Sequence, residues 1–177
     1  TIFARRGEDL LAEISCAVFV LGRHAFNWEQ PERIAVFVDQ NDAVVRAFVR
    51  DVWSRRPPTS RHEFPPPNVT GAVTLLSGLA AMGLHYLPDA RSPLSEKIDS
   101  RALDTIHYAG ATLLAREGDC DDLTVLCCAV LEAAGIPTAM AVGAGHVLFL
   151  LDTGISAANI EDTPFSPDTV VVRGEKI

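Results

Sequence analysis

The stretch GDCDDLTVLCCAVLEAAG, residues 118–135, decides the fold because it carries a complete set of helix signals. Asp119 is a favourable N-cap residue, two acidic residues follow in the first turn, and Gly135 and Pro137 are typical of a helix end. Between these ends the residues are apolar nearly all round, which is typical of a helix buried on most sides. The sequence therefore predicts a buried central helix that begins beside Cys120.

Cys120 is the candidate nucleophile of this chain because it falls in the first turn of the predicted helix. The free N–H groups and the positive dipole end of a helix stabilise a thiolate, and the same N–H groups can form an oxyanion hole. The charges of Asp121 and Asp122 oppose this effect, so a cationic histidine partner would decide the balance.

A predicted antiparallel hairpin follows the helix. Residues 137–142 and 146–151 are short β-type runs, and Gly143, Ala144 and Gly145 join them. This order lets the start of the second strand, at His146, return to the start of the helix. A cysteine facing a histidine there is the thiol analogue of the serine–histidine pair. From the residue pattern alone, packing roles for both side chains are the commoner interpretation.

Residues 118–154, GDCDDLTVLCCAVLEAAGIPTAMAVGAGHVLFLLDTG, resemble the transglutaminase-like (papain-fold) core of cysteine proteases and transglutaminases. The family pattern is a Gly-x-Cys-x-Asp helix start, a Gly-Ile-Pro exit, a strand and a Gly-His strand. Residues 104–120, DTIHYAGATLLAREGDC, also resemble the lead into this cysteine in bacterial members. The resemblance covers about residues 84–177. It implies an α+β papain-like fold, with the nucleophile helix packed on a small antiparallel sheet, Cys120 as nucleophile and His146 as base.

The third member of the family's Cys-His-Asp triad, an Asp or Asn one strand after the histidine, is where this sequence departs from the pattern. Asp152 lies about 20 Å from His146 at the usual rise of roughly 3.3 Å per residue, so a strand-end turn role is expected for it. Asp162 matches an Asp-Thr ending but lacks an apolar strand before it. Our hypothesis places the orienting acid beyond Ile177.

Other histidines and aromatic residues are weaker candidates. His107 and Tyr108 precede the nucleophile helix and are candidates for lining the substrate cleft, although ordinary core or surface roles are the commoner interpretation. His24, His62 and His85 have no partner at motif spacing, and we assign them no role.

The remaining cysteines are expected to pack as small hydrophobic side chains: Cys127 and Cys128 inside the helix, and Cys16 in the core. A zinc site made of Cys120, Cys127 and His146 fails because two ligands about 10 Å apart along one helix cannot share an ion with bonds of roughly 2.3 Å. No metal or cofactor is expected.

The rest of the chain divides at a proline-rich segment. We expect an N-terminal lobe or extension over 1–56, largely helical, a connector over 57–67, and the transglutaminase-like core over 68–177, truncated at its C-terminal end. Residues 10–20 are compatible with a strand or a buried helix.

Two further helices and a final strand are predicted. The first helix covers 41–53 with Asn41 as its cap. The second starts at a cap on Asn68 and ends near Met82, before Gly83, and its expected inner side chains are Val73, Leu75, Leu76, Leu79 and Ala80. A loop is expected over 153–168 and a strand over 169–173.

Composition sets the remaining bounds. With 177 residues, 48% of them apolar, the chain can bury a core, and its net charge of −8 with scattered basic residues argues against nucleic-acid binding. No run is long and apolar enough to insert into a membrane. No signal peptide is visible and the chain looks trimmed, so its location in the cell cannot be read from it, and a place in a larger multidomain protein is compatible with this appearance.

The implied function is thiol-dependent acyl chemistry on peptide or protein amides. Water as acceptor makes a cysteine peptidase or amidase, which is a hydrolase, and an amine makes a transglutaminase, which is an acyltransferase. We favour hydrolysis. The alternative is a catalytically incomplete module of the same fold that binds a peptide or a partner protein.

Overall fold

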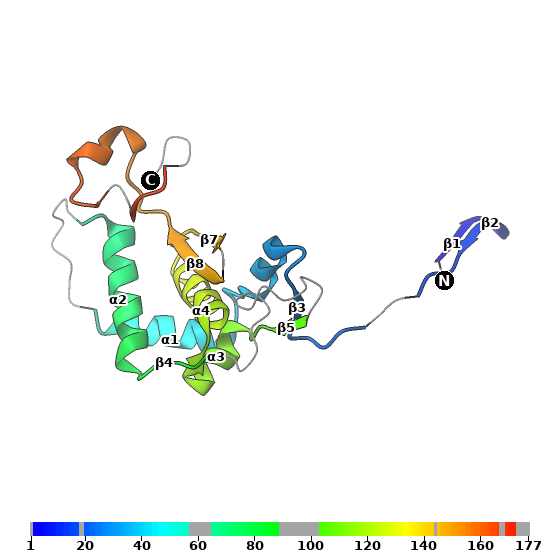
Figure 1. The fold of residues 1–177 in the computed structure, drawn as a ribbon, viewed down its shortest axis with the longest axis horizontal. Coiled ribbons are helices and arrows are strands. Elements are labelled where there is room, and N and C mark those ends of the chain that lie inside the picture. Colours follow the sequence, from blue (N-terminus) through cyan, green and yellow to red (C-terminus); the bar gives the residue numbers. More distant parts are fainter. Residues whose placement is uncertain are drawn as a thin grey trace.

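The protein has an α+β fold in which helices pack on short two-stranded sheets (Figure 1). The computed structural model describes residues 2–17, 20–56, 65–88, 103–143, 145–166 and 169–172. The elements are, in chain order, β1 (Ile2–Arg6), β2 (Asp9–Ile14), β3 (Ala25–Asn27), the 3-10 helix η1 (Pro31–Phe37), α1 (Ala43–Ser54), α2 (Pro67–Ala81), β4 (His85–Tyr86), β5 (Leu103–Thr105), α3 (Ala109–Ala115), β6 (Glu117–Gly118), α4 (Cys120–Ala133), β7 (Thr138–Gly143), β8 (His146–Leu151) and the 3-10 helix η2 (Ala157–Asp162).

Helix α4 lies at the centre of the fold, as the sequence predicts. It contacts α1, α2, α3, η1 and both strands of the β7–β8 hairpin. Its side chains Val125, Leu126, Val130 and Leu131 are completely shielded from solvent. The core joins side chains from both sides of the proline-rich segment, including Phe26, Ile34 and Val45 before it and Leu75, Ile106 and Val125 after it.

The β7–β8 hairpin is confirmed. The two strands pair antiparallel from Thr138 opposite Leu151 to Gly143 opposite His146. The other small sheets join segments far apart in the sequence: β3 pairs antiparallel with β5, and β4 pairs parallel with β6. These pairings join the chain before α1 to the chain before α3, and the chain after α2 to the chain before α4.

The ambiguous stretch at 10–20 forms a strand in its first part. Strand β2 pairs with β1 as an antiparallel hairpin whose side chains are all exposed. Figure 1 shows this hairpin set apart from the rest of the fold. The prediction that Cys16 belongs to the core is therefore wrong, because Cys16 follows this hairpin and is exposed.

The two predicted helices before the site exist, with corrected details. The cap of α1 is Asp42 instead of Asn41, because the Asp42 carboxylate accepts hydrogen bonds from the N–H groups of Val44 and Val45 at 2.8 and 3.1 Å. Helix α2 begins at Pro67, and Asn68 lies inside its first turn.

The buried face of α2 differs from the prediction at two positions. The helix buries Ala72, Leu75 and Leu79, which share one face at helical spacing. Val73 points to another side and is 58% exposed, and Ala80 is also exposed.

The end of the chain also differs from the prediction. Part of the expected loop forms η2, and residues 169–172 do not form the expected strand. Thr169 instead turns back, since its N–H and its hydroxyl both donate to the Ser166 carbonyl. The connector expected over 57–67 falls mostly on residues outside the described part, so the division of the chain into 1–56, 57–67 and 68–177 stays a prediction.

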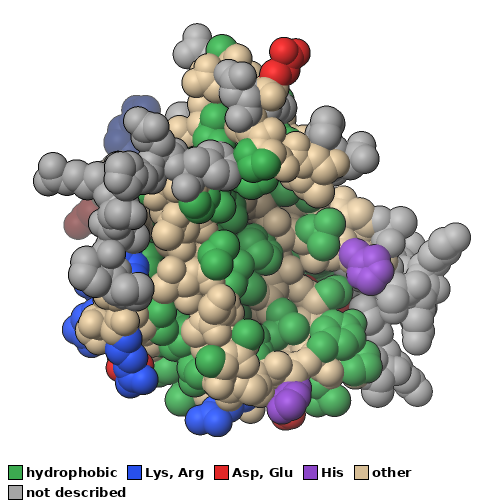
Figure 2. Space-filling view, turned by 90° about the vertical axis from the view of Figure 1, so that its left-hand side faces the viewer, with side chains coloured by type: hydrophobic (Ala, Val, Ile, Leu, Met, Phe, Trp, Pro, Cys, Tyr) green, Lys and Arg blue, Asp and Glu red, His purple; other side chains and the backbone are tan. Residues whose placement is uncertain are grey.

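Hydrophobic side chains also reach the surface. Figure 2 shows patches of them on the side of the molecule that carries α2, and Val73 and Leu114 are among the exposed residues. Within the described ranges, no helix has both the length and the apolar character needed to cross a membrane.

Candidate active site

The candidate nucleophile Cys120 is the first residue of α4, where the sequence places it. Asp119 is extended and caps the helix, with its carboxylate accepting from the Asp122 N–H at 3.3 Å. Gly118 precedes this cap in a crowded place, because a Cβ there would lie 2.7 Å from the Asp122 Cβ. The Gly-Asp-Cys sequence therefore lets the chain enter the helix tightly against its own first turn.

The Cys120 thiol is half-buried between the start of α4 and strand β8. Burial raises its pKa above the ordinary value, a hydrogen bond from the Val147 backbone N–H lowers it, and the charges of Asp121 and Asp119 raise it further. The net direction is upward, so the resting group is a neutral thiol at pH 7. Burial and the neighbouring acids thus outweigh the stabilisation of a thiolate expected from the helix terminus.

Strand β8 packs on α4, and Val147 carries a hydrogen bond between them. The Val147 carbonyl accepts a 3.1 Å hydrogen bond from the Thr124 hydroxyl, one turn beyond Cys120, and the Val147 backbone also lowers the pKa of the Cys120 thiol. Val147 itself is only 2% exposed. His146 directly precedes Val147 and is exposed at the turn end of the hairpin, opposite Gly143. The fold therefore brings the start of β8 to the start of α4.

Asp152 and Asp162 are the two weaker in-chain candidates for the third acid, and the structure describes the side chain of Asp152 but not that of Asp162. Asp152 follows β8 as a turn residue: its carboxylate accepts from the Gly154 N–H at 2.8 Å, and its carbonyl accepts from the Asn68 amide. This is the turn role expected for it. The side chain of Asp162 lies outside the described part, as does every residue after 172, so the hypothesis of an acid beyond Ile177 stays a prediction.

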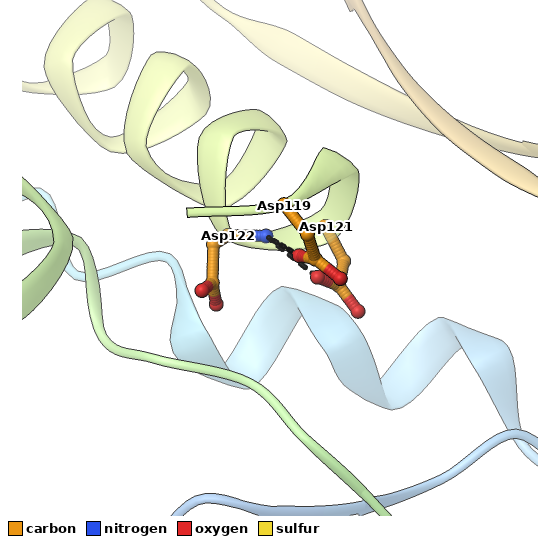
Figure 3. Close-up of side chains that lie close together, drawn as sticks. All are labelled: Asp119, Asp121 and Asp122. Carbon is orange, nitrogen blue, oxygen red and sulfur yellow. Dashed lines mark hydrogen bonds between the residues drawn. The ribbon is translucent and has the colours of Figure 1, made fainter. Parts of the chain in front are cut away.

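Three buried acids surround the start of α4. The ligand-type atoms of Asp119, Asp121 and Asp122 lie within 4.8 Å of one another, and Figure 3 shows the three carboxyl groups on the same side of the first turn. Burial, the hydrogen bond with Asp119 and the surrounding negative charges raise the pKa of Asp121 to about 9. A protonated Asp121 donates to Asp119 and accepts from the Asp122 N–H at 2.8 Å. Hydrogen bonds among the carboxyl groups and the Asp122 N–H thus account for the close approach of the three acids.

His107 and Tyr108, the cleft candidates, directly precede α3, with His107 exposed and Tyr108 half-buried. The His107 Nδ1 lies 2.9 Å from a carboxylate oxygen of Asp122, and its backbone N–H donates to the other oxygen at 2.7 Å. Tyr108 caps α3 and packs its ring against Phe37 at 5.1 Å between centroids. No contact between either residue and Cys120 occurs among the described interactions, so a place in the substrate cleft stays a prediction.

His24 is the neighbour that sequence reasoning missed. Its ring lies 5.1 Å from the His107 ring and 5.7 Å from the Tyr108 ring, measured between centroids. The residues are far apart in the sequence, and only the pairing of β3 with β5 brings them together. The short run around His24 carries no local signal that could have revealed this pair.

Cys127 and Cys128 are packing residues, as expected. Burial raises the pKa of Cys127 to about 12 and that of Cys128 to about 11. Cys128 is 1% exposed. Both thiols stay protonated at neutral pH, with Cys128 buried and Cys127 half-buried against the core.

Two hollows of the described surface lie away from Cys120. One of about 620 Å³ lies over the far end of the β7–β8 hairpin and is lined by Val69, Pro137, Met140, Phe149, Leu151 and Phe165, among others. A second of about 510 Å³ lies between η1 and the outer side of β7.

Comparisons with known proteins identify no relative: no protein-family profile, no curated protein and no solved structure matches this chain.

Proposed function

We propose that this chain performs thiol-dependent acyl chemistry on peptide or protein amides, on a papain-like core, with Cys120 as nucleophile and His146 as general base. The observation that carries the proposal is the packing of the start of β8 on the first turn of α4, where the Thr124 hydroxyl donates to the Val147 carbonyl at 3.1 Å and the Val147 backbone lowers the pKa of the Cys120 thiol. This packing brings the strand that starts at His146 next to the thiol, and the proposed reaction requires the His146 ring within hydrogen-bond reach of the sulfur.

The reaction would begin with a neutral thiol. Because the pKa of Cys120 is raised, a base must remove its proton as the sulfur attacks the amide carbonyl carbon. His146 would take this proton, the tetrahedral adduct would collapse with cleavage of the C–N bond, and the imidazolium would return the proton to the departing amine. Water would then hydrolyse the thioester, with His146 again as base.

Backbone donors at the sulfur support the same chemistry. The N–H groups of Val147 and of Cys120 itself both lower the pKa of the thiol, so both direct positive charge toward it. Donors in such positions stabilise the oxyanion of a tetrahedral adduct. Asp119 and Asp121, at the start of the helix, raise the pKa of the thiol instead. The proposed reaction therefore depends on His146 to remove the thiol proton.

A specific observation also favours the second candidate, a catalytically incomplete module that binds a peptide. The raised pKa of Cys120 leaves the thiol unreactive at rest, and the hollow of about 620 Å³ has mainly apolar walls away from this thiol. Such a hollow suits apolar side chains of a peptide.

The test is acylation of Cys120 by p-nitrophenyl acetate, followed by mass spectrometry and by release of p-nitrophenol at pH 7.5. The protein carries Cys16→Ser, because Cys16 is exposed and would also react. We expect an acetyl group on Cys120 that forms and is then hydrolysed. His146→Ala should slow acylation by about 10²-fold or more, the contribution typical of a general base.

Two controls make this test decisive. His85→Ala removes another exposed histidine, on β4, and should leave the acylation rate unchanged. Cys120→Ala should abolish the adduct. Equal acylation rates in wild type and His146→Ala would contradict the proposal and favour the binding module.

A further inference from the structure

Two histidines that the proposed reaction does not use form a pair on the surface beside β3 and β5. The ring centroids of His24 and His107 are 5.1 Å apart, and the rings are tilted by 43°. Ala25 pairs with Thr105, and the Ile106 N–H donates to the His24 carbonyl at 2.9 Å. The sheet therefore fixes the backbone on both sides of the pair.

Hydrogen bonds fix the tautomer of both rings. The His24 Nδ1 lies 2.9 Å from the carbonyl oxygen of Ile106, which can only accept, so this nitrogen carries the proton. The His107 Nδ1 lies 2.9 Å from a carboxylate oxygen of Asp122, which also accepts. Each neutral ring therefore keeps an unprotonated Nε2 whose lone pair is available.

We propose that His24 and His107 bind a divalent transition-metal ion through their two Nε2 atoms. A tetrahedral ion bonded at roughly 2.0–2.1 Å to one nitrogen of each ring would place the ring centroids about 5 Å apart. The observed centroid separation of 5.1 Å is close to this spacing.

The groups behind the rings are those that support metal-binding histidines. Such histidines donate their second ring N–H to a carboxylate or a backbone carbonyl, which orients the ring and raises its basicity. His107 has a carboxylate, Asp122, and His24 has a carbonyl, that of Ile106. Asp122 is 5% exposed and is held in the first turn of α4, so the orientation of His107 is anchored in the core.

The ligand chemistry defines the class of ion. Imidazole nitrogen suits Zn²⁺, Cu²⁺ and Ni²⁺, whereas Mg²⁺ and Ca²⁺ prefer oxygen. The His107 side chain is 46% exposed, so an ion can enter from solvent and water can complete its coordination. Among nearby charges, Arg23 lies over the Tyr108 ring, and Asp119 and Asp122 at the start of α4 add negative charge beside Asp104 of β5.

Titration calorimetry with Zn²⁺ tests the site on the full chain carrying Cys16→Ser and Cys120→Ala, so that neither of the accessible thiols competes. We expect one ion per chain. His24→Ala and His107→Ala should each weaken binding at least about tenfold, and the double variant should abolish it. His85→Ala and His146→Ala are the matched controls and should bind as the parent does.

A second measurement needs no further variant. Zn²⁺ added to the ¹⁵N-labelled parent should shift the Nε2 resonances of His24 and His107 and leave those of His85 and His146 in place. Co²⁺ should give visible bands without a thiolate charge-transfer band. Zn²⁺ affinity that is unchanged in the double variant, or no binding near 1 mM Zn²⁺, would overturn the proposal. Neither result depends on acylation of Cys120. Absence of zinc binding would therefore contradict only the metal site, and absence of acylation would contradict only the proposed function.

Discussion

The Thr124 hydroxyl donates a 3.1 Å hydrogen bond to the Val147 carbonyl, and the backbone of the same β8 residue lowers the pKa of the Cys120 thiol. This hydrogen bond fixes the start of β8 on the first turns of α4. The position of the proposed base, His146, depends on this attachment.

Removal of the Thr124 hydroxyl should loosen the attachment. Thr124→Val keeps the shape of the side chain but leaves the buried Val147 carbonyl without its donor, and we expect a loss of about 1–3 kcal/mol in the free energy of unfolding. Urea denaturation measures it. Thr105→Val, at an exposed position of β5, is the control and should stay within about 0.5 kcal/mol of wild type. Equal stabilities for the two variants would show that the bond contributes nothing.

Asp121 should make the stability depend on pH. Its pKa in the folded protein, about 9, lies above the ordinary value of 3.8, so its contribution is fully present below about pH 4 and is lost as the pH rises toward 9. Asp121→Asn keeps the hydrogen bonds without the charge. Its stability relative to wild type should therefore increase with pH between 5 and 9, by at most about 1.4 kcal/mol per pH unit.

Thermal and urea unfolding at several pH values check this dependence. Asp51→Asn is the control, because Asp51 is an exposed carboxylate paired with Arg55 on α1 and should show no such trend. A stability difference between Asp121→Asn and wild type that stays flat from pH 5 to 9 would mean that Asp121 is ionised in the folded protein.

Gly110 is required by the close approach of α3 to the start of α1. A Cβ at Gly110 would lie 2.6 Å from the Asp42 carboxyl carbon, and this carboxylate cannot move without breaking its bonds to Val44 and Val45. Gly110→Ala should therefore cost about 1–3 kcal/mol of stability, although alanine favours a helix. Gly22→Ala, where the added methyl group meets open space, should be nearly neutral in the same denaturation experiment.

The cysteines should differ sharply in their reaction with iodoacetamide. Cys16 is exposed and should react first, Cys120 should react more slowly because its pKa is raised, and Cys127 and Cys128 should remain unmodified in the native protein at pH 8. Peptide mapping by mass spectrometry measures the four rates, and urea should make them converge. Modification of Cys128 at the rate of Cys16 without denaturant would contradict the burial of α4.

Local signals allowed the sequence to predict the elements that carry the candidate site. The cap at Asp119, the turn at Gly135 and the glycines between β7 and β8 each act over a few residues. A short stretch of sequence is therefore enough to predict the helix end or turn that each one forms. Predictions of which side chains are buried against another element were less successful: Cys16 and Val73 are exposed, because no element of the described residues covers them.

The amino-acid sequence by itself determined that a buried helix starts at Cys120 and that a hairpin with His146 beside its turn follows. Tertiary structure alone decided that the Val147 backbone lies close enough to the Cys120 thiol to lower its pKa, that Asp121 is buried among acidic groups and that His24 meets His107. The physical reason is the distance along the chain over which each interaction acts. Capping and turn preferences act between neighbours in the chain, whereas desolvation, charge proximity and ring contacts depend on segments that only the packing of the core brings together.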